Sequence, residues 1–255
     1  MATNRVIGVD VGGTKIAAGV VGRDGSVDRL TEVATPGGSE QGVLAALEEL
    51  VERLLDDEVG GIGLGVPSTV DQRTGRAISS VNIPFADVPL RDLVGARFGL
   101  PCGVDNDANA AAIGEWQAGA GRGARHLVML TLGTGVGGGL ILDGRPYRGA
   151  VGAAAELGHI VVEHDGRPCQ GTCTGRGHLE AYATGGAASR DAEAAFGAGA
   201  DSRVLLERAQ EGDERALEIL DAIGRRLGSA LGTIVNVFDP ELIVIGGGWG
   251  EAANG

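Results

Sequence analysis

Residues 6–21 read VIGVDVGGTKIAAGVV, and this segment gives the strongest local indication of the fold class. Two apolar runs flank a turn with two consecutive glycines, which predicts a pair of strands over residues 6–10 and 16–21. Glycine lets main-chain N–H groups point at oxygens, Thr14 adds a hydroxyl, and Asp10 adds a carboxylate that can hold a hydrated Mg²⁺. A structural turn is the alternative, but a plain hairpin needs neither the aspartate nor the Gly-Gly-Thr sequence. The stretch therefore indicates a phosphate-binding hairpin.

The same design returns later in the chain. Residues 127–132 (LVMLTL) predict a buried strand, residues 133–139 (GTGVGGG) a glycine-rich turn, and residues 140–142 a return strand. Two such hairpins indicate a duplicated α/β arrangement that grips one polyphosphate from both sides. A third glycine turn, Gly246–Gly248, follows a predicted buried strand over residues 242–245.

Residues 156–180, ELGHIVVEHDGRPCQGTCTGRGHLE, hold two of the three cysteines and three of the four histidines. Four N and S ligands in twenty residues are typical of a tetrahedral zinc site. The predicted ligands are His159, Cys169, Cys173 and His178. The alternative is a pair of buried cysteines with loop histidines, although the glycines and the proline here supply no core. Glu156 and Glu180 bracket the stretch and are not needed for zinc.

Residues 105–109 (DNDAN) stand between a short extended run and an apolar helix over residues 110–116. A carboxylate at the end of a strand in an α/β protein projects into a ligand-binding crevice. Asp and Asn are also favoured helix N-caps, and the sequence alone leaves these two interpretations open.

Further helices are predicted from Ser39 to about residue 57, and over residues 91–98, 181–196, 202–210 and 214–238. Asp239-Pro240 ends the last of them. The chain stops at Gly255, where another helix is expected, so we expect a C-terminal truncation.

The net charge of −13 argues against a nucleic-acid or anionic-membrane binder. No signal-peptide core and no apolar run of membrane-spanning length occurs. Three cysteines, two of them in the metal stretch, do not make a disulfide framework. These features predict a soluble cytoplasmic protein.

The motifs together resemble the ROK family of sugar kinases and sugar-sensing repressors, most closely its glucokinases. They follow one another in family order over nearly the whole chain. The motifs are Asp10-x-Gly-Gly-Thr14, Gly65-x-Pro67 with Asp71, Asn82-x-Pro84, Asn106-Asp107-Ala-Asn109, Gly133-Thr-Gly-x-Gly-Gly138, Glu156-x-Gly-His159, the cysteine loop ending at Glu180, and Asp239-Pro-Glu with Ile245-Gly-Gly-Gly248.

The resemblance implies an α/β, two-domain actin-like ATPase fold, related to ribonuclease H, with sugar in an interdomain cleft. A smaller domain would span residues 1–108 and a larger domain residues 109–255. The implied activity is ATP-dependent phosphorylation of a hexose at its 6-hydroxyl, with glucose first, which belongs to glycolysis and carbohydrate metabolism. Implied cofactors are ATP with Mg²⁺ and a structural Zn²⁺, and implied assembly is a homodimer or homotetramer.

The resemblance also implies residue roles. Asp107 would be the general base. The residues expected to bind sugar are Asn82, Asn106, Asp107, Glu156, His159 and Glu180. Those expected to face ATP and its Mg²⁺ are Asp10, Gly12, Gly13, Thr14, Lys15, Gly133, Thr134, Gly135, Gly246, Gly247 and Gly248.

The zinc loop departs from the family pattern. Two extra residues separate Cys169 from the second cysteine, and His178 replaces a third cysteine. His164 or Asp165 is an alternative ligand. His159 could bind zinc through one ring nitrogen and a sugar hydroxyl through the other.

Other functions stay open at the level of sequence. Fructose, mannose or an N-acetylated amino sugar could replace glucose, and polyphosphate could replace ATP. A non-catalytic sugar sensor is a further alternative, although a repressor needs a helix-turn-helix before the first strand.

Overall fold

The computed structural model describes residues 5–80 and 82–252. These residues divide into two compact units. The first contains Met1–Gly123, Gly139–Ile141 and Arg145–Ala154, and the second contains Ala124–Gly138, Leu142–Gly144 and Ala155–Gly255. Each unit is described by itself.

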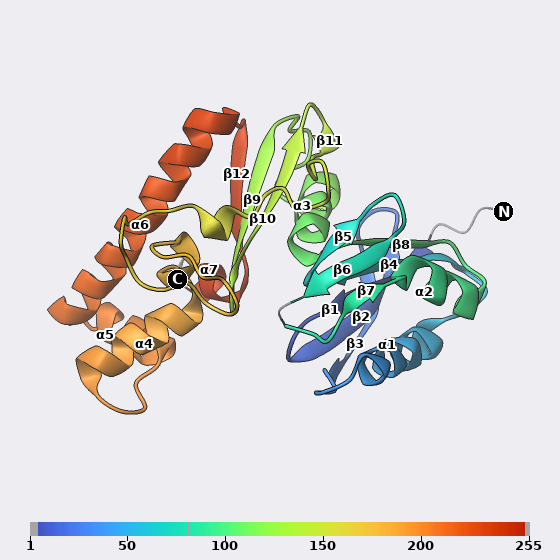
Figure 1. The fold of residues 1–255 in the computed structure, drawn as a ribbon, viewed down its shortest axis with the longest axis horizontal. Coiled ribbons are helices and arrows are strands. Elements are labelled where there is room, and N and C mark those ends of the chain that lie inside the picture. The colour runs from blue at the N-terminus through green and yellow to red at the C-terminus, as the bar shows by residue number, and fades with distance from the viewer. Residues whose placement is uncertain (1–4, 81, 253–255) are drawn as a thin grey trace. The chain divides into compact units, whose positions relative to one another are not determined.

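The first unit is built on a five-stranded sheet of order β3-β2-β1-β4-β8 (Figure 1). The predicted hairpin is confirmed as the antiparallel strands β1 (Arg5–Val11) and β2 (Lys15–Gly22). Strand β3 (Val27–Ala34) pairs antiparallel with β2, while β4 (Val59–Val66) and β8 (Cys102–Asn106) run parallel to β1. Asp10 lies beside Gly65, and Gly65 beside Asp105. The carboxyl ends of three parallel strands therefore lie in register at one sheet edge.

Helices α1 (Glu40–Leu54), α2 (Leu90–Phe98) and α3 (Asp107–Ala118) belong to this unit. Ser39 caps α1 as predicted, because its side chain accepts a hydrogen bond from Gly42 N. Leu47 and Leu50 are fully buried in the core that α1 shares with the sheet. Packing of this apolar stripe, more than helix propensity, holds such a helix in place.

A second, three-stranded sheet of order β5-β6-β7 was not anticipated. Its strands are β5 (Ser68–Asp71), β6 (Arg76–Ser80) and β7 (Ala86–Val88). Strands of three to five residues carry too little alternation to be recognised, so their pairing depends on tertiary contacts.

A third sheet has the order β11-β10-β9-β12, with strands β9 (Leu127–Leu132), β10 (Val136–Leu142), β11 (Arg145–Pro146) and β12 (Leu242–Gly246). β9 and β12 are parallel, with Gly246 opposite Thr131. The glycine turns that follow these two strands therefore emerge at the same sheet edge.

The second unit contains the remaining helices (Figure 1). They are the 3-10 turns η1 (Leu157–His159) and η2 (Leu179–Ala181), and α4 (Gly185–Phe196), α5 (Ser202–Gln210), α6 (Glu214–Phe238) and α7 (Gly248–Ala252). The bounds predicted for α5 and α6 are confirmed. Asp239 ends α6 in a left-handed conformation, with φ of 44°. Among the described residues, no helix combines the length and the hydropathy needed to cross a bilayer.

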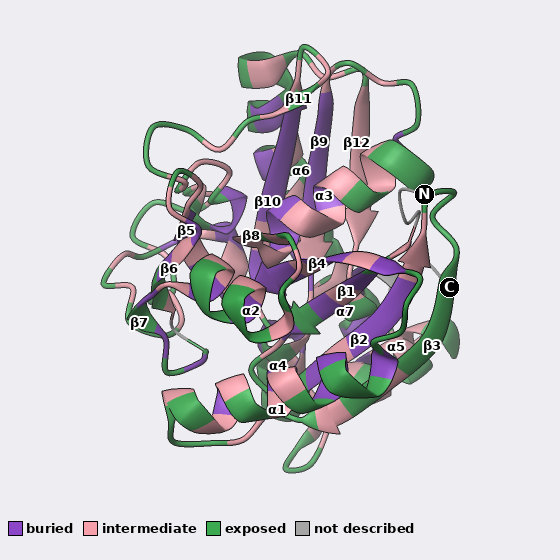
Figure 2. Cartoon of the chain, turned by 90° about the vertical axis from the view of Figure 1, so that its right-hand side faces the viewer, coloured by how far each residue is buried: buried purple, intermediate pink, exposed green. Residues whose placement is uncertain are grey.

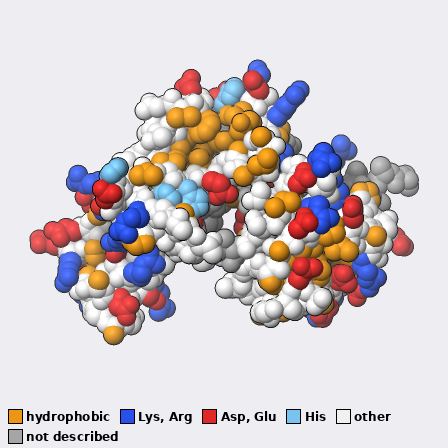
Figure 3. Space-filling view, in the orientation of Figure 1, with side chains coloured by type: hydrophobic (Ala, Val, Ile, Leu, Met, Phe, Trp, Pro, Cys, Tyr) orange, Lys and Arg blue, Asp and Glu red, His pale blue; other side chains and the backbone are white. Residues whose placement is uncertain are grey.

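The prediction that residues 242–245 form a buried strand is wrong in its burial. β12 is an edge strand, and every residue in it is half-buried, whereas β9 is almost wholly buried (Figure 2). Figure 3 shows hydrophobic side chains gathering over this sheet. An apolar run predicts a strand, but which neighbours cover it is a tertiary property.

The compact units differ from the predicted division after residue 108. α3 packs against β4 and β8, and a side chain at Gly139 would collide with Ala112 of α3. These contacts bring α3 and residues 139–141 into the first unit.

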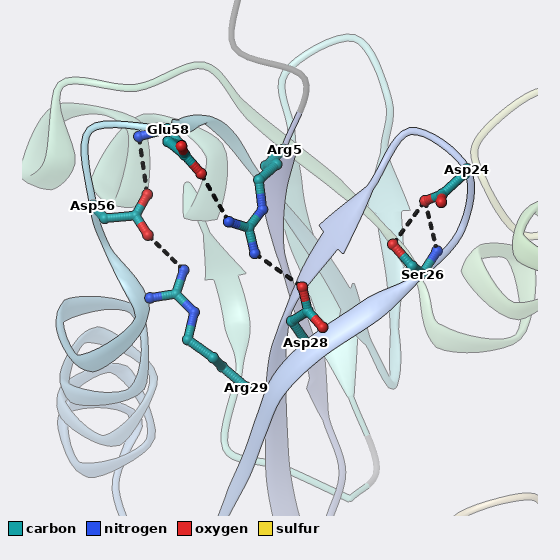
Figure 4. Close-up of polar contacts among 7 residues, drawn as sticks. All are labelled: Arg5, Asp24, Ser26, Asp28, Arg29, Asp56 and Glu58. Carbon is teal, nitrogen blue, oxygen red and sulfur yellow. Dashed lines mark hydrogen bonds and ion pairs between the residues drawn. The ribbon is translucent and has the colours of Figure 1, made fainter.

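A chain of exposed ion pairs joins β1, β3 and the loop before β4 (Figure 4). Arg5 contacts Asp28 at 3.2 Å and Glu58 at 2.9 Å, and Arg29 contacts Asp56 at 2.7 Å. Asp56 also accepts a hydrogen bond from Glu58 N at 2.9 Å. Each exposed ion pair contributes little to the free energy of folding. The network therefore holds the loop before β4 in place more than it stabilises the unit.

We expect Asp56→Asn to lower the melting temperature slightly at neutral pH. The hydrogen bond from Glu58 N, and then the Arg29 guanidinium, lower the pKa of Asp56 below its ordinary 3.8. A carboxyl with a lowered pKa in the folded state contributes stability above its unfolded pKa and loses it as the pH falls through the folded value. The difference from wild type should therefore shrink below about pH 4 in thermal melts, with Asp57→Asn as the control. A difference that persists at pH 2 would contradict this assignment.

Candidate functional site

The glycine hairpin of the first unit has a tightly closed turn. Gly12 N donates to Lys15 O at 2.9 Å, and Thr35 bridges the turn through its N–H to Thr14 O and its Oγ1 to Gly12 O. A Cβ at Gly12 would lie 2.9 Å from Lys15 O, so the turn excludes a side chain there. The turn therefore exposes main-chain atoms and the Thr14 hydroxyl, a combination that can bind phosphate oxygens.

Asp10 is the penultimate residue of β1, close to this turn. Partial desolvation raises the pKa of its carboxyl, and the Lys15 ammonium lowers it. Lys15 itself forms an exposed ion pair with Glu32 at 2.8 Å. A carboxylate beside glycine amides fits the oxygen ligands that Mg²⁺ prefers. Asn82 packs on the same turn, because a Cβ at Gly13 would lie 3.2 Å from Asn82 Cβ.

The β8–α3 junction places residues 105–109 at the end of β8 and the start of α3. Asn106 is the N-cap of α3, since its Oδ1 accepts a hydrogen bond from Asn109 N at 3.1 Å. Asp107 is the first helical residue, and its Oδ1 accepts from Ala108 N at 2.8 Å and from Asn106 Nδ2 at 3.0 Å. Gly65 would place a Cβ 3.6 Å from Asp107 Cα. Asp107 thus lies at the sheet edge that carries Asp10.

The second unit brings two predicted glycine turns together. Gly247, with φ of 89°, lies so close to Leu132 that a Cβ would be 2.5 Å from Leu132 O. The Gly133 turn follows Leu132 directly, and Gly133 N donates to Gly135 O at 3.0 Å. Glu180 lies against this turn, where its Oε2 accepts a hydrogen bond from Val136 N at 2.9 Å. The fold therefore gathers predicted nucleotide-binding and sugar-binding residues at one place in this unit.

The four predicted metal ligands converge. One ligand atom from each of His159, Cys169, Cys173 and His178 lies within 4.8 Å of all the others. The two histidine Nδ1 atoms are 3.2 Å apart, Cys169 Sγ is 3.7 Å from His159 Nδ1, and Cys173 Sγ is 3.6 Å from His178 Nδ1. Histidine side chains gather on the face shown in Figure 3. Two thiols and two imidazoles fit the tetrahedral N and S ligand set of a structural zinc site.

The alternative ligands lie elsewhere. His164 and Asp165 pair with each other at 2.9 Å, and their side chains are 92% and 88% exposed. They are not among the residues that converge, so the geometry favours His178 as the fourth ligand.

Burial and neighbouring charges shift the pKa values of two groups around the cysteine loop. Partial desolvation raises the pKa of Glu156, His159 lowers it, and the carboxylate of Glu180 raises it. This coupling indicates that the two glutamates and His159 share one electrostatic environment. Desolvation also raises the pKa of the Cys169 thiol. A metal ion must displace the protons of such thiols, which makes its binding pH-dependent.

Residues outside the predicted motifs hold the cysteine loop. Tyr182 is buried, its hydroxyl accepts a hydrogen bond from Arg167 N at 2.6 Å, and the guanidinium of Arg226 lies 4.4 Å from its ring centroid. Gln170 Nε2 donates to Glu180 O at 2.9 Å and to Thr184 Oγ1 at 3.1 Å. These contacts join residues that are not neighbours in the sequence, so no local motif predicts them.

We expect Gly177→Ala to disrupt the metal cluster. Gly177 has φ of 71°, and a Cβ there would overlap the Glu163 carbonyl oxygen, so the substitution adds a main-chain collision to the usual conformational cost. Metal content and melting temperature should both fall. Gly199→Ala is the matched control. Gly199 has φ of 88° with open space around it, so alanine there should cost about 1–2 kcal/mol of stability from backbone conformation alone. Equal effects of the two substitutions would contradict a steric cause.

The structure defines a mixed α/β protein with glycine turns in both units and a cluster of two cysteines and two histidines. A search against family models matches residues 6–254 to the ROK family. The glucokinase of Thermotoga maritima is 37% identical over 97% of this chain and 83% of its own length. The chain therefore belongs to the ROK family.

Solved structures agree. A ROK family glucokinase from Streptomyces griseus, in complex with glucose and AMPPNP, is 37% identical, has a TM-score of 0.83, and is matched over 97% of this chain and 84% of that one. A ROK family transcriptional regulator, a homologue of an E. coli protein, has a TM-score of 0.86 at 27% identity, but this chain covers 66% of it. The predicted α/β fold of ROK sugar kinases is confirmed, while the interdomain cleft stays a prediction.

Proposed function

We propose that this chain is an ATP-dependent sugar kinase that transfers the γ-phosphoryl group of ATP to the 6-hydroxyl of glucose. The proposal rests on one observation in the first unit. The glycine hairpin, Asp10 and Asp107 lie together at one edge of the sheet. Similarity to glucokinases over nearly the whole chain supports the same assignment.

The residues of the first unit would perform the transfer. Asp107 accepts the proton of the 6-hydroxyl as that oxygen attacks the γ-phosphorus and the bond to ADP breaks. Main-chain amides of the hairpin and the Thr14 hydroxyl orient the phosphates. Asp10 would hold Mg²⁺, which neutralises phosphate charge when it is bound. Asn106 and Asn82 present amides that can bind sugar hydroxyls.

The residues of the second unit would recognise the sugar and the nucleotide. Glu156 and Glu180 can each accept hydrogen bonds from two vicinal hydroxyls. The cluster would hold a structural zinc through His159 Nδ1, which leaves the opposite ring nitrogen for a sugar hydroxyl. The glycines at 133, 135 and 246–248 and Thr134 would line the nucleotide. A cytoplasmic location and a homodimer or homotetramer are part of this proposal.

The test is a coupled ADP-release assay over glucose, mannose, fructose and the N-acetylated amino sugars, with ATP and polyphosphate as donors. We expect the highest kcat/KM with glucose and ATP. Sugar binding without turnover would instead support a sugar sensor, the alternative that similarity to a transcriptional regulator suggests. A higher kcat/KM with another hexose would support the kinase activity but replace glucose as the proposed substrate.

A further inference from the structure

The carboxylate of Asp105 accepts four hydrogen bonds close to Asp107. The proposed chemistry gives Asp105 no role. Its Oδ2 accepts two hydrogen bonds from Arg148, from Nε at 2.8 Å and from Nη2 at 2.5 Å. Its Oδ1 accepts from Gln72 Nε2 at 3.0 Å and from Asn106 N at 2.9 Å. Its side chain is 13% exposed and that of Arg148 is 25% exposed. A charged pair with this much burial and this many hydrogen bonds is held firmly.

The contacts form a continuous chain that ends on the proposed base. Arg148 holds the Asp105 carboxylate, and that carboxylate accepts the main-chain N–H of Asn106. The Asn106 side chain in turn donates from Nδ2 to Asp107 Oδ1. The same Asn106 caps α3, so a shift in its main chain would move both the helix start and the Asp107 carboxylate.

Arg148 is itself fixed from a distant part of the chain. It lies 43 residues after Asp105, in residues 145–154, which belong to the first unit. Close packing anchors this segment, because a Cβ at Gly152 would overlap Val70 O of β5. Gln72, which follows β5, donates from its Nε2 to both Asp105 Oδ1 and Val104 O. Two anchored segments therefore hold Asp105 from opposite sides of its carboxylate.

We propose that Arg148 and Asp105 are positioning residues for phosphoryl transfer, which aim the Asp107 carboxylate through Asn106. This inference rests on the proposed function, because it assigns a purpose to the geometry of the proposed base. Neither residue needs to touch sugar or ATP. A displacement of about 1 Å at a reacting group costs on the order of 100-fold in rate, so loss of the pair affects turnover more than binding.

The experiment measures kcat, the KM values for glucose and ATP, and the melting temperature of full-length variants. Arg148→Ala and Asp105→Asn should each lower kcat about 10- to 100-fold with KM for ATP within about twofold of wild type. Arg148 and Asp105 act through one contact. The kcat of the double variant should therefore be at most about twofold lower than the kcat of the slower single variant. Arg148→Lys should recover more of kcat than Arg148→Gln, since only lysine keeps a positive charge near Asp105.

Arg76→Ala is the matched control, because Arg76 forms an ion pair with Asp87 at 2.6 Å in the same unit, in a more exposed setting. It should leave kcat unchanged. If Arg148→Ala does not fold, Arg148→Gln and Gln72→Ala carry the test, with reduced kcat expected for both.

Three outcomes distinguish a failure of the positioning role from a failure of the proposed function. Folded Arg148 and Asp105 variants with wild-type kcat, beside an inactive Asp107→Ala, would overturn the positioning role alone. An equal loss of kcat in Arg76→Ala would also overturn it. Absence of turnover with every sugar in wild type would overturn the proposed function and this inference with it.

Discussion

Asp107→Ala is expected to lower kcat for glucose phosphorylation by about 10²–10⁴-fold, the usual contribution of a general base. The substitution removes the carboxylate but leaves the Asn106 cap and the glycine hairpin in place. The dissociation constant for glucose should therefore change by only about threefold or less, because a base acts mainly in the transition state. ADP release measures the first quantity and calorimetric titration with glucose the second.

Two further variants make this test specific. Asp107→Asn keeps the shape of the side chain and should be nearly as slow as the alanine variant, because an amide cannot accept the proton. Asp57→Asn changes an exposed aspartate and should retain full turnover. Near wild-type kcat in Asp107→Asn would refute the assignment of the base.

Cys169→Ser is expected to reduce bound zinc from about one per chain by at least about tenfold at limiting metal, and to lower the melting temperature. The thiolate is a much better zinc ligand than a hydroxyl, and the remaining three groups cannot close a tetrahedral site. The KM for glucose should rise, since His159 and Glu180 are near this loop. Metal analysis, thermal melts and steady-state kinetics measure the three effects.

Cys102→Ser is the matched control, because Cys102 lies on β8, outside the cluster. It should keep full zinc content, with at most a modest loss of stability. Removing zinc from wild type with a chelator should reproduce the kinetic effect of Cys169→Ser. Zinc-free protein with an unchanged KM for glucose would contradict the structural role of the metal.

Local elements followed closely from local pattern. The apolar stripe of α6 and the cap of α1 depend on residues within a few turns of each other, so the sequence predicts both ends of α6 and the start of α1. The short strands β5 to β7 and the half-buried β12 were missed or misjudged for the opposite reason. Their pairing and burial depend on partners far away in the chain.

The predicted site residues were found by type and spacing, and geometry then decided between alternatives. The spacing predicted the metal ligands His159, Cys169, Cys173 and His178, with His164 or Asp165 as an alternative, and in the fold the four predicted residues lie together. The sequence left open whether residues 105–109 form a helix cap or project a carboxylate into a crevice. The structure shows that Asn106 caps α3 and that Asp107 accepts its amide.

The residue pattern alone was enough to identify the two glycine hairpins, the DNDAN segment and the ligand types of the metal loop. Each of these depends on chemistry that neighbouring residues carry: glycine conformational freedom, carboxylate basicity and thiolate affinity for zinc. Three contacts could be seen only in the folded chain: Arg148 holds Asp105, Gly247 packs on Leu132, and the four ligands converge. Such contacts join segments far apart in the chain, and the packing of strands and loops that brings them together has no local signature.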